Sequence, residues 1–178
     1  MRWDSRLQAL FDDLEEQAAG LSLAERDAEV AELRRAEYAR VDLAARLHAS
    51  VGARLVVDVV GVGPVVGQLH RTGEGWLLLG AAQDWLVATA AVGSVRGLLD
   101  RLAVRPEPVQ SRLGIGSVLR GLAAARTEVV VQRVDGRSSR GALGRVGADF
   151  VELRAAETGG DQPPEVFPFT AIAAVRSC

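Results

Sequence analysis

Arginine is the residue type in this chain that is best suited to binding chemistry. All 21 basic residues of the 178-residue sequence are arginine, and eight of them, against four acidic residues, lie between Arg112 and Arg154. The guanidinium group is a planar fork of N–H donors that matches the geometry of a phosphate group. The pattern predicts a phosphate-binding patch formed by Arg71, Arg137, Arg140 and Arg145.

A solvated surface is the alternative explanation for these arginines. Residues 1–40 carry ten acidic residues and six arginines, so they can balance the basic stretch. The net charge of the whole chain is −2, which provides no overall attraction to a nucleic acid. The two interpretations differ in whether the arginines gather on one face.

Other residue types give little support to catalysis or metal binding. His48 and His70 stand apart from cysteines and carboxylates at metal-ligand spacing, and the single cysteine is the last residue, Cys178. Gly61-x-Gly63 runs into a proline and Gly114-x-Gly116 follows a proline-rich segment, so neither has the context of a nucleotide loop. We therefore expect no enzyme activity, no metal site and no cofactor.

Three aromatic side chains are candidates for stacking on nucleic-acid bases. Trp76 and Phe150 occupy matched positions on apolar segments, which favours a role in the core. Trp85 has no aromatic counterpart and is the better candidate for exposure.

The elements that must position these residues occur twice. An offset of 74 residues matches Arg54 with Glu128 at the start of an apolar segment, Gly67 with Gly141, and Trp76 with Phe150. After an insertion the offset becomes 80, and Val95-Arg96 matches Val175-Arg176. Matches in two constant registers indicate an internal duplication of one small β unit.

Each repeat is predicted to have a short helix followed by five strands. In the second repeat, Asp135-Gly136 marks the first tight turn, and the following strand contains Gly141 where strong curvature is expected. We predict helices over Leu43–Ser50 and Leu113–Arg126, a single tight turn at Thr170, and strands over Glu128–Val134, Ser139–Val146, Phe150–Arg154, Val166–Phe169 and Ile172–Arg176. Five short strands with a bent second strand favour a small closed barrel.

The amino-terminal region is predicted to form a helical hairpin. Ser5 and Ser22 each begin a capping box, Gly20 separates the two helices, and the second helix extends to about Arg40. This arm either packs on the first barrel or serves as a dimerisation or partner-docking arm, and the sequence leaves both alternatives open. The predicted domains are a hairpin arm over 1–41, barrels over 42–98 and 112–178, and a linker over 99–111.

Targeting signals are not apparent in the sequence. The first residues turn acidic where an export signal would be apolar, and the apolar runs are interrupted by charged residues and proline. The lone cysteine fits a reducing compartment. We therefore expect a cytoplasmic protein that does not enter a membrane.

The motifs resemble those of the Sm-like family, which includes the Sm, LSm and Hfq proteins. The resemblance rests on Gly141-x-Leu143 followed by Phe150-Val151-x-Leu153, and on Gly67-x-Leu69 followed by Trp76-Leu77-x-Leu79. The arrangement also resembles poorly characterised actinobacterial proteins, some labelled as transcriptional regulators. The resemblance implies tandem Sm-like or SH3-like five-stranded barrels in a mostly β (α+β) chain, homo-oligomers, and RNA in preference to DNA as ligand.

The resemblance does not extend to a base pocket. Members of the family that bind uridine carry an asparagine where this chain has Leu77 and Val151. The leading hypothesis is therefore a non-enzymatic regulator that binds RNA or DNA through the arginine patch. The competing hypothesis is a protein-interaction scaffold that uses the barrel edges and the amino-terminal helices.

Overall fold

The computed structural model describes residues 29–100, 113–155 and 163–178, in two compact units, Met1–Asp42 and Leu43–Cys178. In the first unit a helix covers residues 29–38, and all of its side chains are exposed. This helix confirms part of the predicted second helix of the arm. The rest of the predicted hairpin lies outside the described residues.

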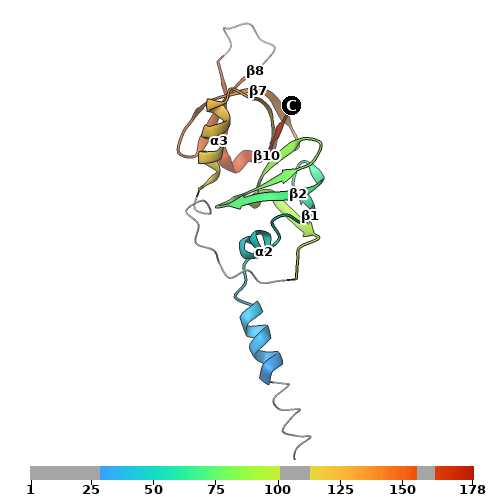
Figure 1. Cartoon of the computed structure of the whole chain (residues 1–178). Coiled ribbons are helices and arrows are strands. Elements are labelled where there is room, and N and C mark those ends of the chain that lie inside the picture. Colours follow the sequence, from blue (N-terminus) through green and yellow to red (C-terminus); the bar gives the residue numbers. More distant parts are fainter. Residues whose placement is uncertain (1–28, 101–112, 156–162) are drawn as a thin grey trace, which may run out of the picture. The chain divides into compact units, whose positions relative to one another are not determined.

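The second unit is mostly β, as expected, with a short helix ahead of each set of five strands (Figure 1). The first repeat consists of α2 (Leu43–Ala49), β1 (Arg54–Val59), β2 (Gly63–Gly73), β3 (Trp76–Gly80), β4 (Asp84–Ala88), η1 (Thr89–Ala91) and β5 (Val92–Arg96). The second consists of α3 (Ile115–Ala124), β6 (Glu128–Arg133), β7 (Ser138–Val146), β8 (Phe150–Ala155), β9 (Glu165–Pro168), η3 (Phe169–Ala171) and β10 (Ile172–Ser177). The predicted helices and strands of the second repeat are confirmed to within one or two residues at each end.

Glycines shape the second strand of each repeat. A Cβ atom on Gly67 would lie 2.7 Å from the carbonyl oxygen of Gly80, and one on Gly141 would overlap the backbone of Arg154. Each position therefore needs a residue without a side chain, because the neighbouring strand approaches too closely for one. The close approach at both equivalent glycines agrees with the predicted bend.

The strands form one continuous antiparallel sheet in the order β5-β1-β2-β3-β4-β10-β6-β7-β8-β9. The expectation of two closed tandem barrels is therefore wrong. To close a barrel, each repeat would have to pair its fourth and fifth strands with one another. Instead, β4 of the first repeat pairs with β10 of the second, through Val87↔Ala174, Leu86↔Val175 and Trp85↔Arg176. We call this pairing the internal joint.

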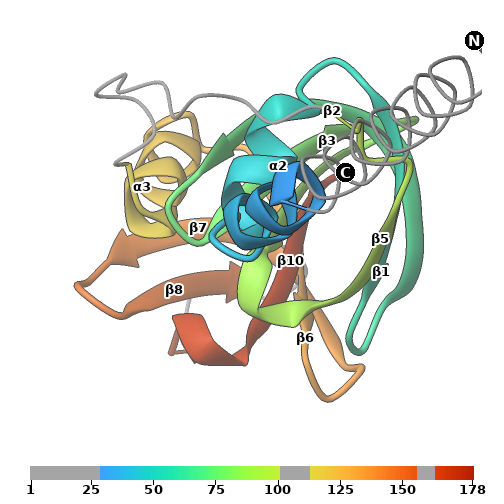
Figure 2. The same cartoon turned by 90° about the horizontal axis from the view of Figure 1, so that it is seen from below.

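The internal joint forms because both of its strands are apolar on both faces. On β4, Val87 packs into the core of the first repeat and Leu86 into the core of the second. On β10, Ala174 and Val175 divide between the two cores in the same way. Figure 2 shows β10 between β1 and β5 on one side and β7 and β8 on the other. In two separate barrels one apolar face of each strand would point to water, and burial of such surface drives folding.

Polar contacts hold α2 against the first repeat and also tie the start of α3 to the first repeat. The buried Ser50, just after α2, donates its hydroxyl to the Arg46 carbonyl oxygen (2.8 Å) and accepts the Leu99 amide (3.0 Å). Before α3, the carbonyl oxygen of Leu113 accepts the Trp76 indole N–H at 2.7 Å. The indole therefore fixes the start of α3 against β3, and burial of Trp76 confirms its predicted place in the core.

The turn between β1 and β2 touches the second repeat. Gly61 has a positive φ of 76°, and a Cβ atom on it would lie 2.8 Å from the Val134 carbonyl oxygen and 2.9 Å from the Gly136 nitrogen. The turn between β6 and β7 is therefore in direct backbone contact with the turn between β1 and β2. This contact and the internal joint hold both repeats in one unit. The predicted boundaries between arm, barrels and linker remain a prediction.

None of the described helices is both long and apolar enough to cross a lipid bilayer.

Candidate functional site

Two of the four predicted phosphate-binding arginines lie in ion pairs on β7. Arg140 Nη2 is 2.9 Å from the Glu128 carboxylate across the β6–β7 pair. Arg145 Nη2 and Nε lie 2.9 and 3.1 Å from the two carboxylate oxygens of Glu152 on β8. Each carboxylate compensates the charge that a phosphate would otherwise meet, so these arginines contribute less to an anion site than their number suggests.

The ion pair of Arg145 and Glu152 has two contacts and a buried carboxylate, whereas both side chains of the pair of Arg140 and Glu128 are exposed. Glu152 is buried, whereas the Arg145 side chain is mostly exposed. The hydrogen bond from Arg145, more than the charge of the guanidinium, lowers the pKa of Glu152 against the opposing effect of burial. The same hydrogen bond raises the pKa of Arg145. This carboxylate is therefore an ionised structural partner at neutral pH.

Arg137 and Arg71 are the two predicted arginines without an ion pair among the described residues. Arg137 is exposed in the turn between β6 and β7, where its backbone amide donates to Asp135 (3.1 Å). The Asp135 carboxylate also lies 2.7 Å from Arg133, which places negative charge in the same turn. Arg71 is exposed on β2, opposite Leu78 of β3.

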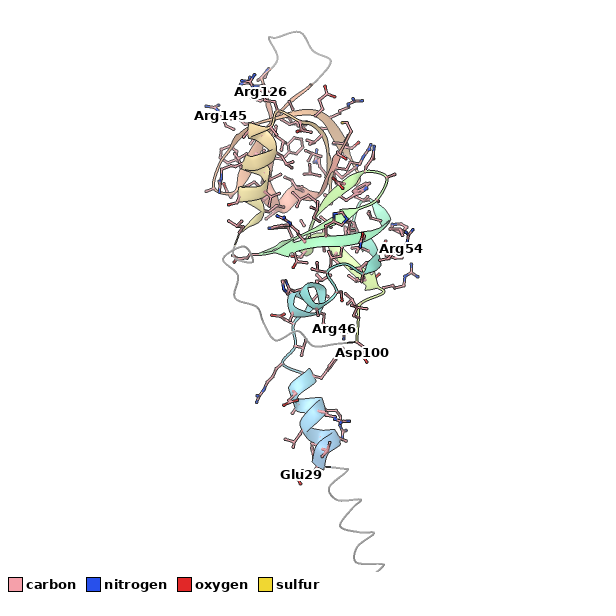
Figure 3. The ribbon with its side chains drawn as sticks, viewed as in Figure 1. Glu29, Arg46, Arg54, Asp100, Arg126 and Arg145 are labelled. Carbon is pink, nitrogen blue, oxygen red and sulfur yellow. The ribbon has the colours of Figure 1, made fainter. Side chains whose placement is uncertain are left out.

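The sheet does not bring the four arginines together through strand pairing. Arg71 lies on β2, and β3, β4, β10 and β6 separate that strand from β7 in the sheet order. Figure 3 shows Arg145 pointing outward on the second repeat, near Arg126 and well away from Arg54 on the first repeat. A dispersed set is the arrangement expected for a solvated surface.

Trp85 does not present a free ring for base stacking. Its side chain is half-buried against the core of the first repeat, and the Arg176 guanidinium lies over the ring, 5.9 Å from the centroid. Arg176 also donates to the side-chain oxygen of Gln83. The indole is therefore part of the internal joint, and it is more exposed than the buried Trp76, although Arg176 covers its ring.

The potential metal ligands of the described residues do not gather into a site. No group of three or more histidine, cysteine or acidic residues lies at metal-binding distance in the part of the chain that the structure describes. His48 Nδ1 is within hydrogen-bonding distance (3.2 Å) of the Thr72 hydroxyl.

The two ends of the sheet are the feature that sequence analysis did not locate. Within the described ranges, β5 pairs only with β1, and β9 pairs only with β8. Each strand therefore leaves one side of its backbone unpaired, and such a side can accept a further strand. By the offset of 80 residues, β5 is the equivalent of β10 and β9 is the equivalent of β4. β9 and β5 thus correspond to β4 and β10, the two strands that pair in the internal joint, but within the described ranges each lacks a partner on that side.

Exposure at the free edges supports this equivalence. Leu86 on β4 is 3% exposed, whereas its counterpart Val166 on β9 is 54% exposed. Ala174 on β10 is completely buried, whereas its counterpart Ser94 on β5 is exposed. Two positions that the internal joint buries are therefore open at the free edges, Val166 on β9 and Ser94 on β5, whereas Phe167 on β9 stays buried.

The chain matches no protein-family model and no curated protein. The geometry of the sheet edges and of the arginines is therefore the basis for assigning a function.

Proposed function

We propose that this chain is a non-enzymatic protein-interaction scaffold that receives extended strands at the two edges of its sheet. The observation that carries the proposal is the pairing of β4 with β10, whose counterparts β9 and β5 lack such partners among the described residues. Addition of a strand to a sheet edge is a common mode of protein recognition, in which backbone hydrogen bonds give affinity and side-chain pockets give specificity.

The side chains of the edges favour specific partners over indiscriminate aggregation. Val166 on β9 offers an apolar contact, and Pro168 ends the strand with a residue that cannot donate a hydrogen bond. β5 carries Gly93 and Ser94 and ends at Arg96. Short edge strands with charged residues and proline limit unspecific pairing.

Binding of short extended peptides tests the proposal without requiring knowledge of a natural partner. A labelled peptide with the sequence of residues 172–177 should bind the β9 edge, and one with the sequence of residues 84–88 should bind the β5 edge. Fluorescence anisotropy should be measured at a protein concentration at which light scattering gives the mass of one chain, 18.9 kDa. Scrambled peptides of the same composition are the control.

A blocked edge provides the matched protein control. Val166→Lys on β9 should weaken binding of the 172–177 peptide at least about tenfold, the equivalent of roughly 1.4 kcal/mol, and leave the 84–88 peptide unaffected. The proposal fails if neither peptide binds more tightly than its scrambled control.

Nucleic-acid binding is the second candidate function. The observation that favours it is the exposure of Arg71 and Arg137, which have no ion-pair partner among the described residues. Changing Arg137 and Arg140 together to glutamate should then abolish binding of single-stranded RNA, whereas Arg54→Glu with Arg120→Glu should not. Binding that is insensitive to salt, or insensitive to the first pair of substitutions, would reject this candidate.

A further inference from the structure

The helix over residues 29–38, here called the arm helix, has an apolar side that stays exposed. Its described part begins at Glu29 (Figure 3), and every side chain in it is exposed. The exposed fractions of its large apolar side chains are 45% for Val30, 59% for Leu33 and 53% for Tyr38. Most of the stability of a helix in a protein comes from packing of its apolar side. The arm helix is therefore a surface for a partner, and its side chains indicate which one.

Six residues form one side of the arm helix and of the turn that follows it. With about 100° of rotation per residue, positions spaced by three and four residues fall on the same side of a helix. The Val41 amide donates to the Tyr38 carbonyl oxygen at 3.0 Å, which continues the helix by one tight turn. This side, here called the arm stripe, consists of Val30, Leu33, Arg34, Glu37, Tyr38 and Val41. The opposite side carries Glu32, Arg35, Ala36 and Ala39.

The arm stripe is complementary to itself. Its six positions are symmetric about the point midway between Arg35 and Ala36. At equal distances from this point, apolar residues stand opposite apolar residues, and Arg34 stands opposite Glu37. A two-fold contact between identical surfaces brings each residue to the counterpart position of the other copy. We propose that the arm helices of two copies of this chain pair antiparallel along the arm stripe, which joins Val30 with Val41, Leu33 with Tyr38, and Arg34 with Glu37.

The two charged residues of the arm stripe determine the direction of the pair. Arg34 and Glu37 are both exposed, and neither has an ion-pair partner among the described residues. In the antiparallel pair each Arg34 meets Glu37 of the other copy, so two ion pairs form at the centre. A parallel pair in register would place arginine against arginine and glutamate against glutamate, which is unfavourable. Polar residues within a helix pair fix its register and direction in this way, at some cost in stability.

The small size of the arm stripe makes the association depend on concentration. Each copy supplies only four apolar side chains, and the central ion pairs lose water on contact, which offsets much of their attraction. Mass action then decides how much of the protein is paired. The contact is isologous, so it closes at two copies. It uses no residue of β5 or β9 and is therefore independent of the proposed function at the sheet edges.

Charge reversal with mixing tests the pairing in the full-length protein. Arg34→Glu and Glu37→Arg each place like charges opposite one another at both central positions. Each variant alone should therefore remain at 18.9 kDa in light scattering, at concentrations at which the unchanged protein has twice that mass. An equimolar mixture should dimerise, because positions 34 and 37 are acidic in one copy and basic in the other. Arg35→Glu and Glu32→Arg make the same charge changes on the opposite side of the helix and should dimerise like the unchanged protein.

Engineered cysteines test the direction of the pair. Cysteine keeps a small apolar side chain, so Val30→Cys and Val41→Cys can be made with Cys178→Ser, which removes the native thiol. A disulfide requires Cα atoms within about 7 Å of one another. In the antiparallel pair residue 30 lies beside residue 41 of the other copy, whereas the two residues 30 are about 16 Å apart along the helix axis. Mild oxidation should therefore link the mixture of the two variants and leave each variant alone unlinked.

Each outcome of the two experiments decides the proposal. Recovery of the dimer on mixing cannot arise from a folding defect, because both variants must be folded to complement each other. An unchanged protein that stays at the mass of one chain at all concentrations would overturn the pairing, and so would charge-reversed variants that dimerise without mixing. Equal loss of the dimer in Glu32→Arg and Glu37→Arg would show that the arm stripe is not the contact. A disulfide formed by Val30→Cys alone would indicate a parallel pair and would overturn the antiparallel arrangement.

Discussion

The guanidinium group of Arg176 on β10 lies over the indole ring of Trp85 on β4, 5.9 Å from the ring centroid, where the two repeats join. The two residues are directly opposite in the register of the internal joint. This contact is one of three residue pairs in the internal joint, and it adds a side-chain interaction to the strand pairing and the apolar burial there.

The coupling between Trp85 and Arg176 should be measurable in a double-mutant cycle. Trp85→Leu and Arg176→Met keep apolar bulk and remove the ring and the charge. We expect a coupling of about 0.5–1 kcal/mol in the free energy of unfolding, the range of a cation–π contact at a partly exposed site. Urea unfolding of the four proteins gives the value. Additivity of the two single effects would show that the contact contributes nothing beyond packing.

The contact at Gly61 should make this glycine more sensitive than others with the same backbone conformation. Gly61→Ala places a Cβ atom against the backbone of the turn between β6 and β7. Gly75 has a similar φ of 79° and open space around it, so Gly75→Ala carries the conformational penalty alone. We expect Gly61→Ala to lower the free energy of unfolding by about 1–3 kcal/mol more than Gly75→Ala, because a backbone clash cannot be relieved by a side chain. Equal effects in thermal or urea unfolding would mean that the two turns do not touch.

The ion pair of Arg145 and Glu152 should make stability depend on pH. The pKa of Glu152 is lowered in the folded chain, chiefly by the hydrogen bond from Arg145. A carboxyl with a depressed folded pKa adds stability above its unfolded pKa of about 4.3, and loses it as the pH falls through the folded value. The stability difference between the unchanged protein and Glu152→Gln should therefore be largest at neutral pH and shrink in acid. Urea unfolding across this range checks the sign, and a difference that grows in acid would contradict it.

The buried hydroxyl of Ser50 should be important for the attachment of α2. Ser50→Ala removes the acceptor of the Leu99 amide and the donor to the Arg46 carbonyl oxygen. Leaving a buried polar group unsatisfied costs about 1–3 kcal/mol, so we expect a loss of that size in the free energy of unfolding. Ser138→Ala, at an exposed position, should change stability by less than about 0.5 kcal/mol. Equal losses in the two variants would rule out this role.

The elements of the second unit were predictable because local signals determine them. Asp135-Gly136 supplies the chemistry of a tight turn, and Gly136 has the positive φ of 85° that such a turn uses. The closing strands begin where expected because a one-turn helix, η1 or η3, precedes each of them at the same offset. These features involve residues close in sequence, so periodicity and turn residues are sufficient to place them.

The pairing of the repeats was not predictable in the same way, because alternating apolar residues do not identify the partner strand. The sequence does contain a signal: Ile172-Ala173-Ala174-Val175 is apolar on both faces, whereas its counterpart Val92-Gly93-Ser94-Val95 is not. A strand that is apolar on both faces is typical of the interior of a larger sheet. For the arginines, counting charges along the chain overlooked that Glu128 and Glu152 lie on strands paired with β7, beside Arg140 and Arg145.

Hydrogen exchange at the two free edges is the most direct test of the central claim that β5 and β9 are pairing surfaces. Exchange of the segments 92–96 and 165–168 should be followed by mass spectrometry with and without the 84–88 and 172–177 peptides, with segment 84–88 of β4 in the protein as the internal reference. We predict that the 84–88 peptide protects β5 and the 172–177 peptide protects β9, while β4 stays protected throughout. Exchange at β5 and β9 that is unchanged by the two edge peptides would contradict the scaffold.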